Sequence, residues 1–185
     1  MGCLQFVIHN EVNFLDTIKS LIRNIPDFPK PGIMFKDITP LLKNAVGFNR
    51  TIELIAANFN PAETDVICGI ESRGFIFAAA LAIKLNKGFV PIRKAGKLPW
   101  ETTQVKYSLE YGEDSIEVHN DAFTGGARVV LVDDLLATGG TAKAACGLIE
   151  KTGGKLNSVQ FVIELSFLNG RDLLKNYKVN SILNY

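Results

Sequence analysis

Apolar residues along this chain occur in two patterns, one of short unbroken runs and one in which they recur every three to four positions. Unbroken runs rich in β-branched residues are typical of strands that are buried on both faces of a parallel sheet. They predict strands at residues 65–70, 89–92, 129–132 and 158–165. The helical spacing predicts helices at residues 13–23, 47–58, 75–85, from the turn at 138–141 to about Thr152, and near 171–175. Strands that alternate with helices indicate an α/β domain with a central, mostly parallel sheet flanked by helices.

Two segments depart from this alternation. Residues 25–40, IPDFPKPGIMFKDITP, contain four prolines and six large apolar residues. Because prolines exclude regular structure and ordinary loops are polar, we expect an irregular apolar strap here. Residues 93–106, RKAGKLPWETTQVK, are predicted to form a basic loop, and 107–109 with 115–118 a β-hairpin around Tyr111–Gly112.

The bulk properties of the chain exclude several classes of function. Its 185 residues, 47% of them hydrophobic, suffice for the core of one domain. A net charge of +1 provides no global field for nucleic acid or a membrane surface, and the longest apolar run, 75–83, is too short to span a bilayer. Three scattered cysteines and the lack of a signal-peptide pattern fit a reduced compartment. We therefore expect one cytoplasmic domain, 1–185, with 1–12 as an N-terminal extension and neither nucleic acid nor membrane as a partner.

The strand predicted at 129–132 leads into the segment with the clearest chemistry, VVLVDDLLATGGTA at 129–142. Asp133 and Asp134 follow the strand directly, at the carboxyl end where open α/β sheets place their ligands. The turn TGGT at 138–141 then presents backbone N–H groups and hydroxyls at the start of a helix, which suits an anion. Two other glycine-rich nucleotide motifs, GxxxxGKS/T and GxGxxG, do not occur in the sequence.

Carboxylates repel a phosphate but accept hydrogen bonds from the hydroxyl groups of a ribose. The segment therefore predicts a site for a sugar phosphate, with the acidic pair on the ribose and the turn at 138–141 on the phosphate. The alternative is an ordinary βα turn with a solvated acidic pair, which a motif of this length disfavours.

This segment resembles the phosphoribosyl-pyrophosphate (PRPP) binding motif of type I phosphoribosyltransferases, and its ending DLLATGGT is similar to the adenine phosphoribosyltransferase version. The resemblance covers residues 13–185 in five ordered segments. It implies the type I phosphoribosyltransferase fold, with a small N-terminal hood at 25–42 that binds the base and a mobile catalytic loop and hairpin, or flap, at 93–112. It also implies that Asp133 and Asp134 hold the ribose hydroxyls. The implied 5′-phosphate contacts are Ala137, Thr138, Gly139, Gly140 and Thr141.

A second turn, Ser72-Arg73-Gly74, also lies between a predicted strand and a predicted helix and has the same anion-binding design. Two such turns suit a ligand with two phosphate ends. Taken alone, the second turn is better explained as a helix-capping Ser beside a solvent-exposed Arg. The resemblance implies instead that it is the family's pyrophosphate loop, with Ser72 and Arg73 facing the diphosphate.

Arg93, Lys94 and Lys97 place three cations within five positions of the predicted basic loop. A charge run of this kind is usually a solvated face. The resemblance implies a loop that closes over PRPP and excludes water. It places these cations on the diphosphate and gives Arg93 a catalytic role as well.

Glu110 and Tyr111 belong to SLEYG, near the tip of the predicted hairpin. An isolated Glu on a hairpin is ordinarily a surface residue. The resemblance implies that Glu110 assists removal of a proton from the purine as the glycosidic bond forms, and that Tyr111 belongs to the same flap.

The proline-rich segment has the composition of a pocket for a flat base. Phe35 offers an aromatic face, and the backbones of Met34 and Lys36 offer donors and acceptors at the edge of a ring. The alternative is an apolar strap that packs on the core. The resemblance implies that these three residues clamp adenine.

The resemblance as a whole implies transfer of the 5-phosphoribosyl group from PRPP to adenine, giving AMP and pyrophosphate, by a homodimer. Mg²⁺ would arrive with PRPP, because no dedicated metal cage is evident in the sequence. Two alternatives stay open. One is transfer to another purine or to orotate, against which the adenine-type motif and hood argue; the other is a non-catalytic PRPP-sensing regulator, which would be expected to carry a nucleic-acid-binding attachment.

Overall fold

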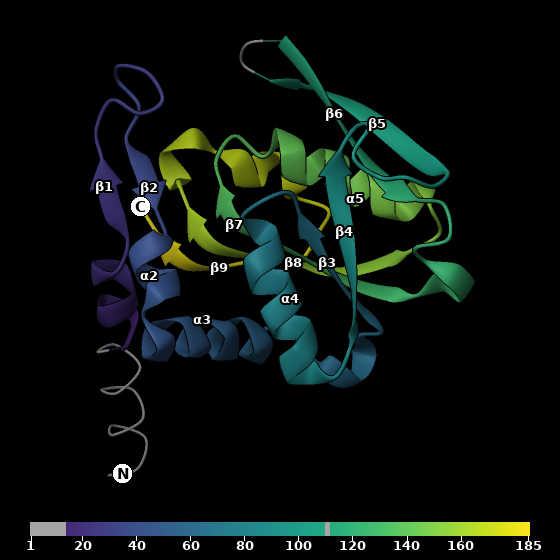
Figure 1. The fold of residues 1–185 in the computed structure, drawn as a ribbon, viewed down its shortest axis with the longest axis horizontal. Helices are drawn as coiled ribbons and strands as arrows, with labels where there is room; N and C mark the ends of the chain where they lie inside the picture. Colours follow the sequence, from purple (N-terminus) through teal and green to yellow (C-terminus); the bar gives the residue numbers. More distant parts are fainter. Residues whose placement is uncertain (1–13, 110–111) are drawn as a thin grey trace. The chain divides into compact units, whose positions relative to one another are not determined.

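The computed structural model describes residues 14–109 and 112–185, and contacts within it divide the chain into two units, Met1–Leu54 and Ile55–Tyr185. Figure 1 gives the labels of the helices and strands. Among the described residues, none of the helices combines the length and the apolar character needed to cross a membrane.

The first unit contains a two-stranded antiparallel sheet and short helices. Residues 14–20 are helical, and strand β1 (Arg23–Ile25) pairs with β2 (Phe35–Asp37). Helix α2 (Thr39–Lys43) follows, and α3 (Ala45–Ala57) begins in this unit. The buried apolar side chains of the unit are Ile18, Ile22, Ile38, Leu41 and Ile52.

The expectation that prolines exclude regular structure from residues 25–40 is wrong in part. Strand β2 and the start of α2 both lie in this segment. Pro26, Pro29 and Pro31 fall in the connection between β1 and β2, where no ladder hydrogen bond is lost. Pro40 lies in the first turn of α2, where the missing N–H has no helical partner in any case.

The second unit is built on a seven-stranded sheet in the order β5-β6-β4-β3-β7-β8-β9. The strands are β3 (Val66–Ile70), β4 (Gly88–Lys94), β5 (Thr102–Leu109), β6 (Gly112–His119), β7 (Arg128–Leu136), β8 (Lys155–Glu164) and β9 (Val179–Asn184). The five strands from β4 to β9 in this order are parallel, and the β5–β6 hairpin extends the sheet in antiparallel fashion. This confirms the predicted α/β architecture.

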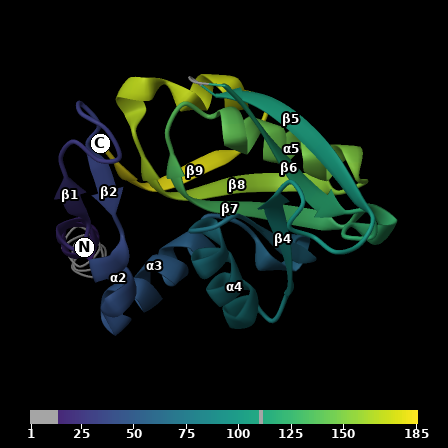
Figure 2. The same ribbon diagram turned by 45° about the horizontal axis from the view of Figure 1, so that its top comes forward.

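Helices cover both faces of this sheet. Helix α4 (Gly74–Leu85) and helix α5 (Gly140–Lys151) lie on opposite faces (Figure 2). The core between α5 and the sheet consists of fully buried apolar side chains, among them Cys68, Val129, Leu131, Val159 and Phe161. The short 3₁₀ helices are η1 (Pro61–Glu63), η2 (Thr124–Gly126), η3 (Ser166–Leu168) and η4 (Gly170–Leu174).

Several predicted boundaries need correction because strand pairing continues beyond the apolar runs. Strand β7 includes Asp133 and Asp134, since residues as far as Leu136 pair with β8. Strand β4 includes Arg93 and Lys94, which pair with β6. Residues 102–106, predicted as loop, belong to β5.

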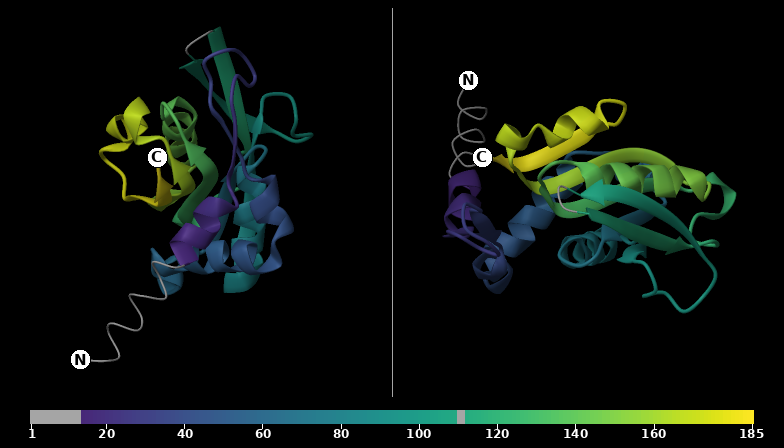
Figure 3. Two further views of the ribbon diagram at one scale, coloured as in Figure 1. Left: turned by 90° about the vertical axis from the view of Figure 1, so that its left-hand side faces the viewer. Right: turned by 90° about the horizontal axis from the view of Figure 1, so that it is seen from above.

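The carboxyl-terminal segment also differs from the prediction. The short helix expected near 171–175 is the 3₁₀ helix η4. The sequence pattern did not indicate strand β9, which lies beside β8 at the edge of the sheet (yellow in Figure 3). Its sequence VNSILN alternates weakly, and the pairing with β8 decides its structure.

Candidate active site

The turn after β3 is brought against the acidic pair of β7 by a glycine. A Cβ atom on Gly74, the first residue of α4, would lie 2.7 Å from Asp133 Oδ1 and 3.0 Å from the carbonyl oxygen of Val132. Only glycine allows this approach. The predicted diphosphate turn at residues 72–74 and the predicted ribose carboxylates therefore meet at the carboxyl edge of neighbouring parallel strands.

An ion pair joins the two segments directly. Arg73 Nε lies 2.9 Å from Asp134 Oδ2, and the backbone N–H of Asp134 donates to Asp133 Oδ1 at 2.8 Å. The Asp134 side chain is buried, whereas Asp133 is half-buried. The buried Asp134 carboxylate is thus fixed beside the Arg73 guanidinium.

Burial raises the pKa values of both carboxyls. For Asp133, burial and then the neighbouring Asp134 carboxylate raise the pKa well above its usual range. For Asp134, burial raises the pKa while the Arg73 guanidinium opposes the shift. A raised pKa means that burial disfavours the ionised carboxylates, and hydroxyl donors from a sugar would stabilise them.

The predicted phosphate turn leads into helix α5 as expected. The helix begins at Gly140, and the N-cap residue Gly139 has φ +85°, a left-handed conformation that favours glycine. Thr138 is exposed, and the N–H of Lys143 donates to the carbonyl of Gly139 at 2.9 Å. Ala137 precedes this turn and Thr141 lies in the first turn of the helix. The five residues predicted to hold the 5′-phosphate are therefore contiguous at a helix N-terminus.

The three predicted cations have different surroundings. Arg93 donates to both carboxylate oxygens of Glu71, at 3.1 and 3.2 Å, and to the carbonyl of Lys97 at 3.0 Å. This hydrogen bonding by Arg93 lowers the pKa of Glu71. Arg93 is thus next to the diphosphate turn, while Lys94 Nζ pairs with Asp114 Oδ2 at 3.2 Å and Lys97 is exposed.

Glu117 on β6 anchors the loop between β4 and β5, and the sequence analysis missed it. This carboxylate is only 1% exposed and accepts the backbone N–H groups of Lys97 at 2.8 Å and Leu98 at 2.9 Å. Gln104 donates to its other oxygen at 3.0 Å. Burial alone would raise the pKa of Glu117, but the amide hydrogen bonds lower it below its usual range.

Closure of the loop between β4 and β5 over PRPP, which the resemblance implies, stays a prediction, and the contacts above make it more specific. We expect hydrogen exchange in residues 95–101 to slow on addition of PRPP, because the bound diphosphate supplies an anion for this basic loop. The amides of Lys97 and Leu98 are the exception, since Glu117 already protects them. The Glu117→Gln variant should make these two amides exchange faster. Exchange that ignores PRPP throughout the loop would contradict the idea of closure.

The β5–β6 hairpin packs against the phosphate turn. Tyr107 on β5 forms hydrogen bonds with Asp114 and with the side chain of Thr141, and burial raises its pKa. Figure 2 shows β5 passing over α5. Glu110 and Tyr111 lie outside the described residues, between the end of β5 and the start of β6 in sequence.

Met34, Phe35 and Lys36, predicted to bind the base, belong to the first unit. Phe35 packs edge to face against Phe28, with ring centroids 5.0 Å apart. Met34 is half exposed, and Lys36 Nζ donates to Asn24 Oδ1 at 2.8 Å. Aromatic and apolar surface is therefore available at this part of the hood.

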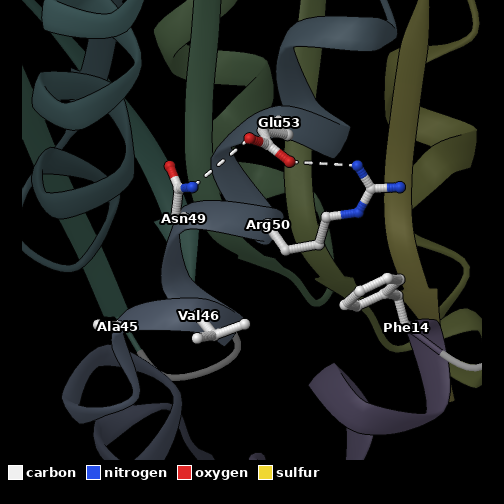
Figure 4. Close-up of a pocket in the computed structure, with 6 residues that line it drawn as sticks. All are labelled: Phe14, Ala45, Val46, Asn49, Arg50 and Glu53. Atoms are coloured by element: carbon white, nitrogen blue, oxygen red, sulfur yellow. Dashed lines mark hydrogen bonds and ion pairs between the residues drawn. The ribbon is translucent and has the colours of Figure 1, made fainter.

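A separate hollow in the first unit contains none of the predicted site residues (Figure 4). The Arg50 guanidinium lies 5.1 Å from the centroid of the Phe14 ring and forms an ion pair with Glu53 at 3.1 Å. Asn49 also donates to Glu53, so the polar groups drawn there largely bind one another.

Comparison with known proteins agrees with this geometry. Residues 41–182 match the family model described as the phosphoribosyl transferase domain. The fold therefore places the chain in the class of phosphoribosyltransferases.

Curated relatives and solved structures narrow this class. The chain is 55% identical over 168 residues to the adenine phosphoribosyltransferase of Roseiflexus sp. (strain RS-1), covering 91% of this chain and 98% of the relative. It is similar to the crystal structure of adenine phosphoribosyltransferase from Thermoanaerobacter pseudethanolicus, with a TM-score of 0.90, 53% identity and coverage of 92% and 99%. The Saccharomyces cerevisiae enzyme, solved with an imino-altritol bisphosphate and adenine, gives a TM-score of 0.88 at 40% identity, with coverage of 93% and 99%.

The chain belongs to the adenine phosphoribosyltransferase family. It is a purine salvage enzyme that transfers the phosphoribosyl group of PRPP to adenine. This confirms the sequence-based prediction of the reaction and of the fold.

Proposed function

We propose that the enzyme binds different parts of PRPP at the two turns that lie at the carboxyl edge of β3 and β7. Ser72 and Arg73 hold the diphosphate, Asp133 and Asp134 hold the ribose hydroxyls, and the turn at 137–141 holds the 5′-phosphate. The observation that carries this assignment is the 2.9 Å ion pair between Arg73 and Asp134. It supports a single site in which Arg73, proposed to bind the diphosphate, lies beside the aspartates proposed to bind the ribose.

The reaction then follows from this arrangement of bound PRPP. A ring nitrogen of adenine forms a bond to C1′ of the ribose while the bond from C1′ to the diphosphate breaks, and the electron pair leaves with pyrophosphate. Arg73, Arg93, Lys94 and Lys97 stabilise the negative charge of the leaving group. Glu110 accepts the proton that the purine loses and offsets positive charge at the ribosyl centre. AMP and pyrophosphate are the products.

Closure of the loop that contains Lys97 keeps water from the ribosyl centre, which water would otherwise attack. Arg93 is suited to couple the loop to the diphosphate, because it already binds Glu71 on one side and the carbonyl of Lys97 on the other. Lys94 would exchange its partner Asp114 for the diphosphate when the site fills.

Mg²⁺ fits this site as a companion of the diphosphate. Magnesium is commonly held by one or two carboxylates together with substrate phosphates, and Asp133 and Asp134 supply carboxylate oxygens at the edge where PRPP is proposed to bind. When bound with the diphosphate, the ion would neutralise charge on the departing pyrophosphate. A turnover assay with and without added Mg²⁺ tests this assignment. We expect turnover to be lost without Mg²⁺ and not to be restored by a monovalent salt.

Adenine is proposed to stack on Phe35, with its edge on the backbones of Met34 and Lys36. We expect Phe35→Ala to weaken adenine binding by about 1–3 kcal/mol, the scale of one lost base–aromatic stack, and to leave PRPP affinity nearly unchanged. Calorimetry with each ligand measures both effects. Phe28→Ala, which removes only the edge-to-face neighbour of Phe35, is the matched control and should act more weakly. Equal losses for adenine and PRPP would instead indicate a collapsed hood.

We also propose that the enzyme is a homodimer in the reducing cytoplasm. The free, buried thiols of Cys68 and Cys146 support a reduced compartment. Large exposed apolar side chains such as Ile83, which is 83% exposed, support a partner surface. Sedimentation at micromolar concentration tests the dimer.

A turnover assay with a panel of bases tests the proposed substrate most simply. We expect AMP and pyrophosphate to form from adenine and PRPP, with much slower turnover of hypoxanthine, guanine and orotate. Faster turnover of another base would show that the hood at 25–42 is specific for that base and not for adenine. PRPP binding without turnover of any base would favour a PRPP-sensing regulator.

A further inference from the structure

The backbone of Gly170 lies directly against the proposed phosphate turn. A Cβ atom on Gly170 would collide with the carbonyl oxygen of Ala137 and come within 2.9 Å of the Gly139 nitrogen. A Cβ on Gly139 would in turn collide with the Gly170 carbonyl oxygen. Both glycines are buried. The start of η4 and the turn at 137–141 therefore touch through bare backbone, so a shift of one moves the other.

The residue after Gly170 ties this contact to the sheet. Arg171 forms a bidentate ion pair with Glu164, with Nε 3.0 Å from Oε1 and Nη2 on Oε2, and its Nη1 donates to the carbonyl of Val179 at 2.9 Å. Ser181 donates to Glu164 Oε2 at 2.6 Å. Arg171 thus binds both β8 and β9, and its hydrogen bonds lower the pKa of the nearly buried Glu164.

Glu164 is also adjacent to the turn along the sheet. It pairs with Leu136, the last residue of β7 before Ala137, and the N–H of Leu165 donates to the Leu136 carbonyl at 2.9 Å. The Arg171–Glu164 pair therefore holds η4 at a fixed place relative to the residue from which the phosphate turn begins.

We propose that Arg171 and Glu164 are positioning residues for the 5′-phosphate. Their ion pair keeps Gly170 against Gly139 and so fixes the direction of the amides at 138–141. This inference rests on the proposed assignment of that turn to the 5′-phosphate. Preorganised amides bind an anion without a cost of reorganisation, and small misplacements of such groups have large effects on binding and rate.

The test compares Arg171→Gln with the wild-type enzyme. We expect the KM for PRPP and the inhibition constant of AMP to rise about 10- to 100-fold, because both ligands carry the 5′-phosphate. The inhibition constant of pyrophosphate and the kcat at saturating PRPP should change about twofold at most. Arg171→Lys keeps the charge but loses the bidentate geometry. Its KM for PRPP and its inhibition constant for AMP should therefore lie between those of the wild type and Arg171→Gln.

Arg128→Gln is the matched control. Arg128 forms a comparable bidentate pair with Asp65, at 2.9 and 2.6 Å, at the start of β7 and far along that strand from the turn. We expect this control to leave the AMP and PRPP constants unchanged. If Arg171→Gln does not fold, the same constants are measured for Arg171→Lys and Ser181→Ala, and we expect the AMP and PRPP constants to rise in both.

The outcomes separate the inference from the assignment on which it rests. Thr141→Val, a change within the turn itself, should also weaken AMP and PRPP. If neither Thr141→Val nor Gly140→Pro, which removes one of the turn's N–H groups, weakens either ligand, the turn does not bind the phosphate. If Thr141→Val weakens AMP but Arg171→Gln does not, the positioning role alone is wrong. Equal weakening of AMP and pyrophosphate by Arg171→Gln would show general damage to the site and would also overturn the inference.

Discussion

Replacing both carboxylates of the acidic pair, in Asp133→Asn with Asp134→Asn, is expected to lower PRPP affinity at least about 100-fold. Hydrogen bonds to charged groups contribute about 1.5–3 kcal/mol each, and neutral amides accept ribose hydroxyl hydrogen bonds less strongly than carboxylates. Two such losses correspond to about 3 kcal/mol or more, or about two orders of magnitude in the dissociation constant. Titration calorimetry with PRPP measures the change.

The fold should survive this double change. A carboxyl whose pKa is raised by burial, as in Asp133 and Asp134, destabilises the folded state when it is ionised. This penalty is present above the folded-state pKa and disappears as the pH falls through the unfolded-state value, so neutral Asn removes it at pH 7. We therefore expect an unchanged or higher Tm. Asp65→Asn is the control, since its removal breaks the ion pair with Arg128 and should leave PRPP binding intact. Wild-type PRPP affinity in the double variant would refute the role of the pair.

The second large effect is expected from Glu110→Ala, which should lower kcat by about 10²–10⁴-fold, the usual contribution of a general acid or base. The dissociation constant of adenine should change little, because the proton moves only as the glycosidic bond forms. Pre-steady-state measurement of AMP formation separates the chemical step from product release.

A carboxylate three positions further along the sequence provides the control for Glu110. Glu113 is exposed on β6 and pairs with Ser108 of β5. Glu113→Ala should turn over adenine at close to the wild-type rate. If Glu110→Ala does the same, Glu110 is an ordinary surface residue and the proton has another acceptor.

The part of the site that the sequence predicted rests on local signals. The unbroken run at 129–132 and the glycines at 139–140 indicate a buried strand and a turn into a helix, and β7 and α5 have this form. The turn at 72–74 carries the same signal, and the structure joins it to the acidic pair through Arg73. The turn can approach the acidic pair because Gly74 has no Cβ atom that would collide with Asp133.

The parts that were missed depend on partners far away in sequence. Glu117 looks like a polar residue on one face of a strand, and its burial is explained by donors elsewhere in the sequence, among them the amides of Lys97 and Leu98. The pairing of Lys94 with Asp114 on the neighbouring strand β6 was not indicated by the sequence either, while the role of Lys94 at the diphosphate stays a prediction. Glu71 likewise acquires its role only when the fold brings Arg93 beside it. Charge patterns along the chain do not reveal such pairings, because the register between strands determines them.

A crystal structure of the enzyme with AMP and pyrophosphate tests the central assignment most directly. We expect the AMP phosphate on the backbone N–H groups at 138–141, its ribose hydroxyls on Asp133 and Asp134, and pyrophosphate at Ser72 and Arg73. AMP phosphate in the turn at 72–74, or ribose hydroxyls without contact to either aspartate, would contradict the assignment.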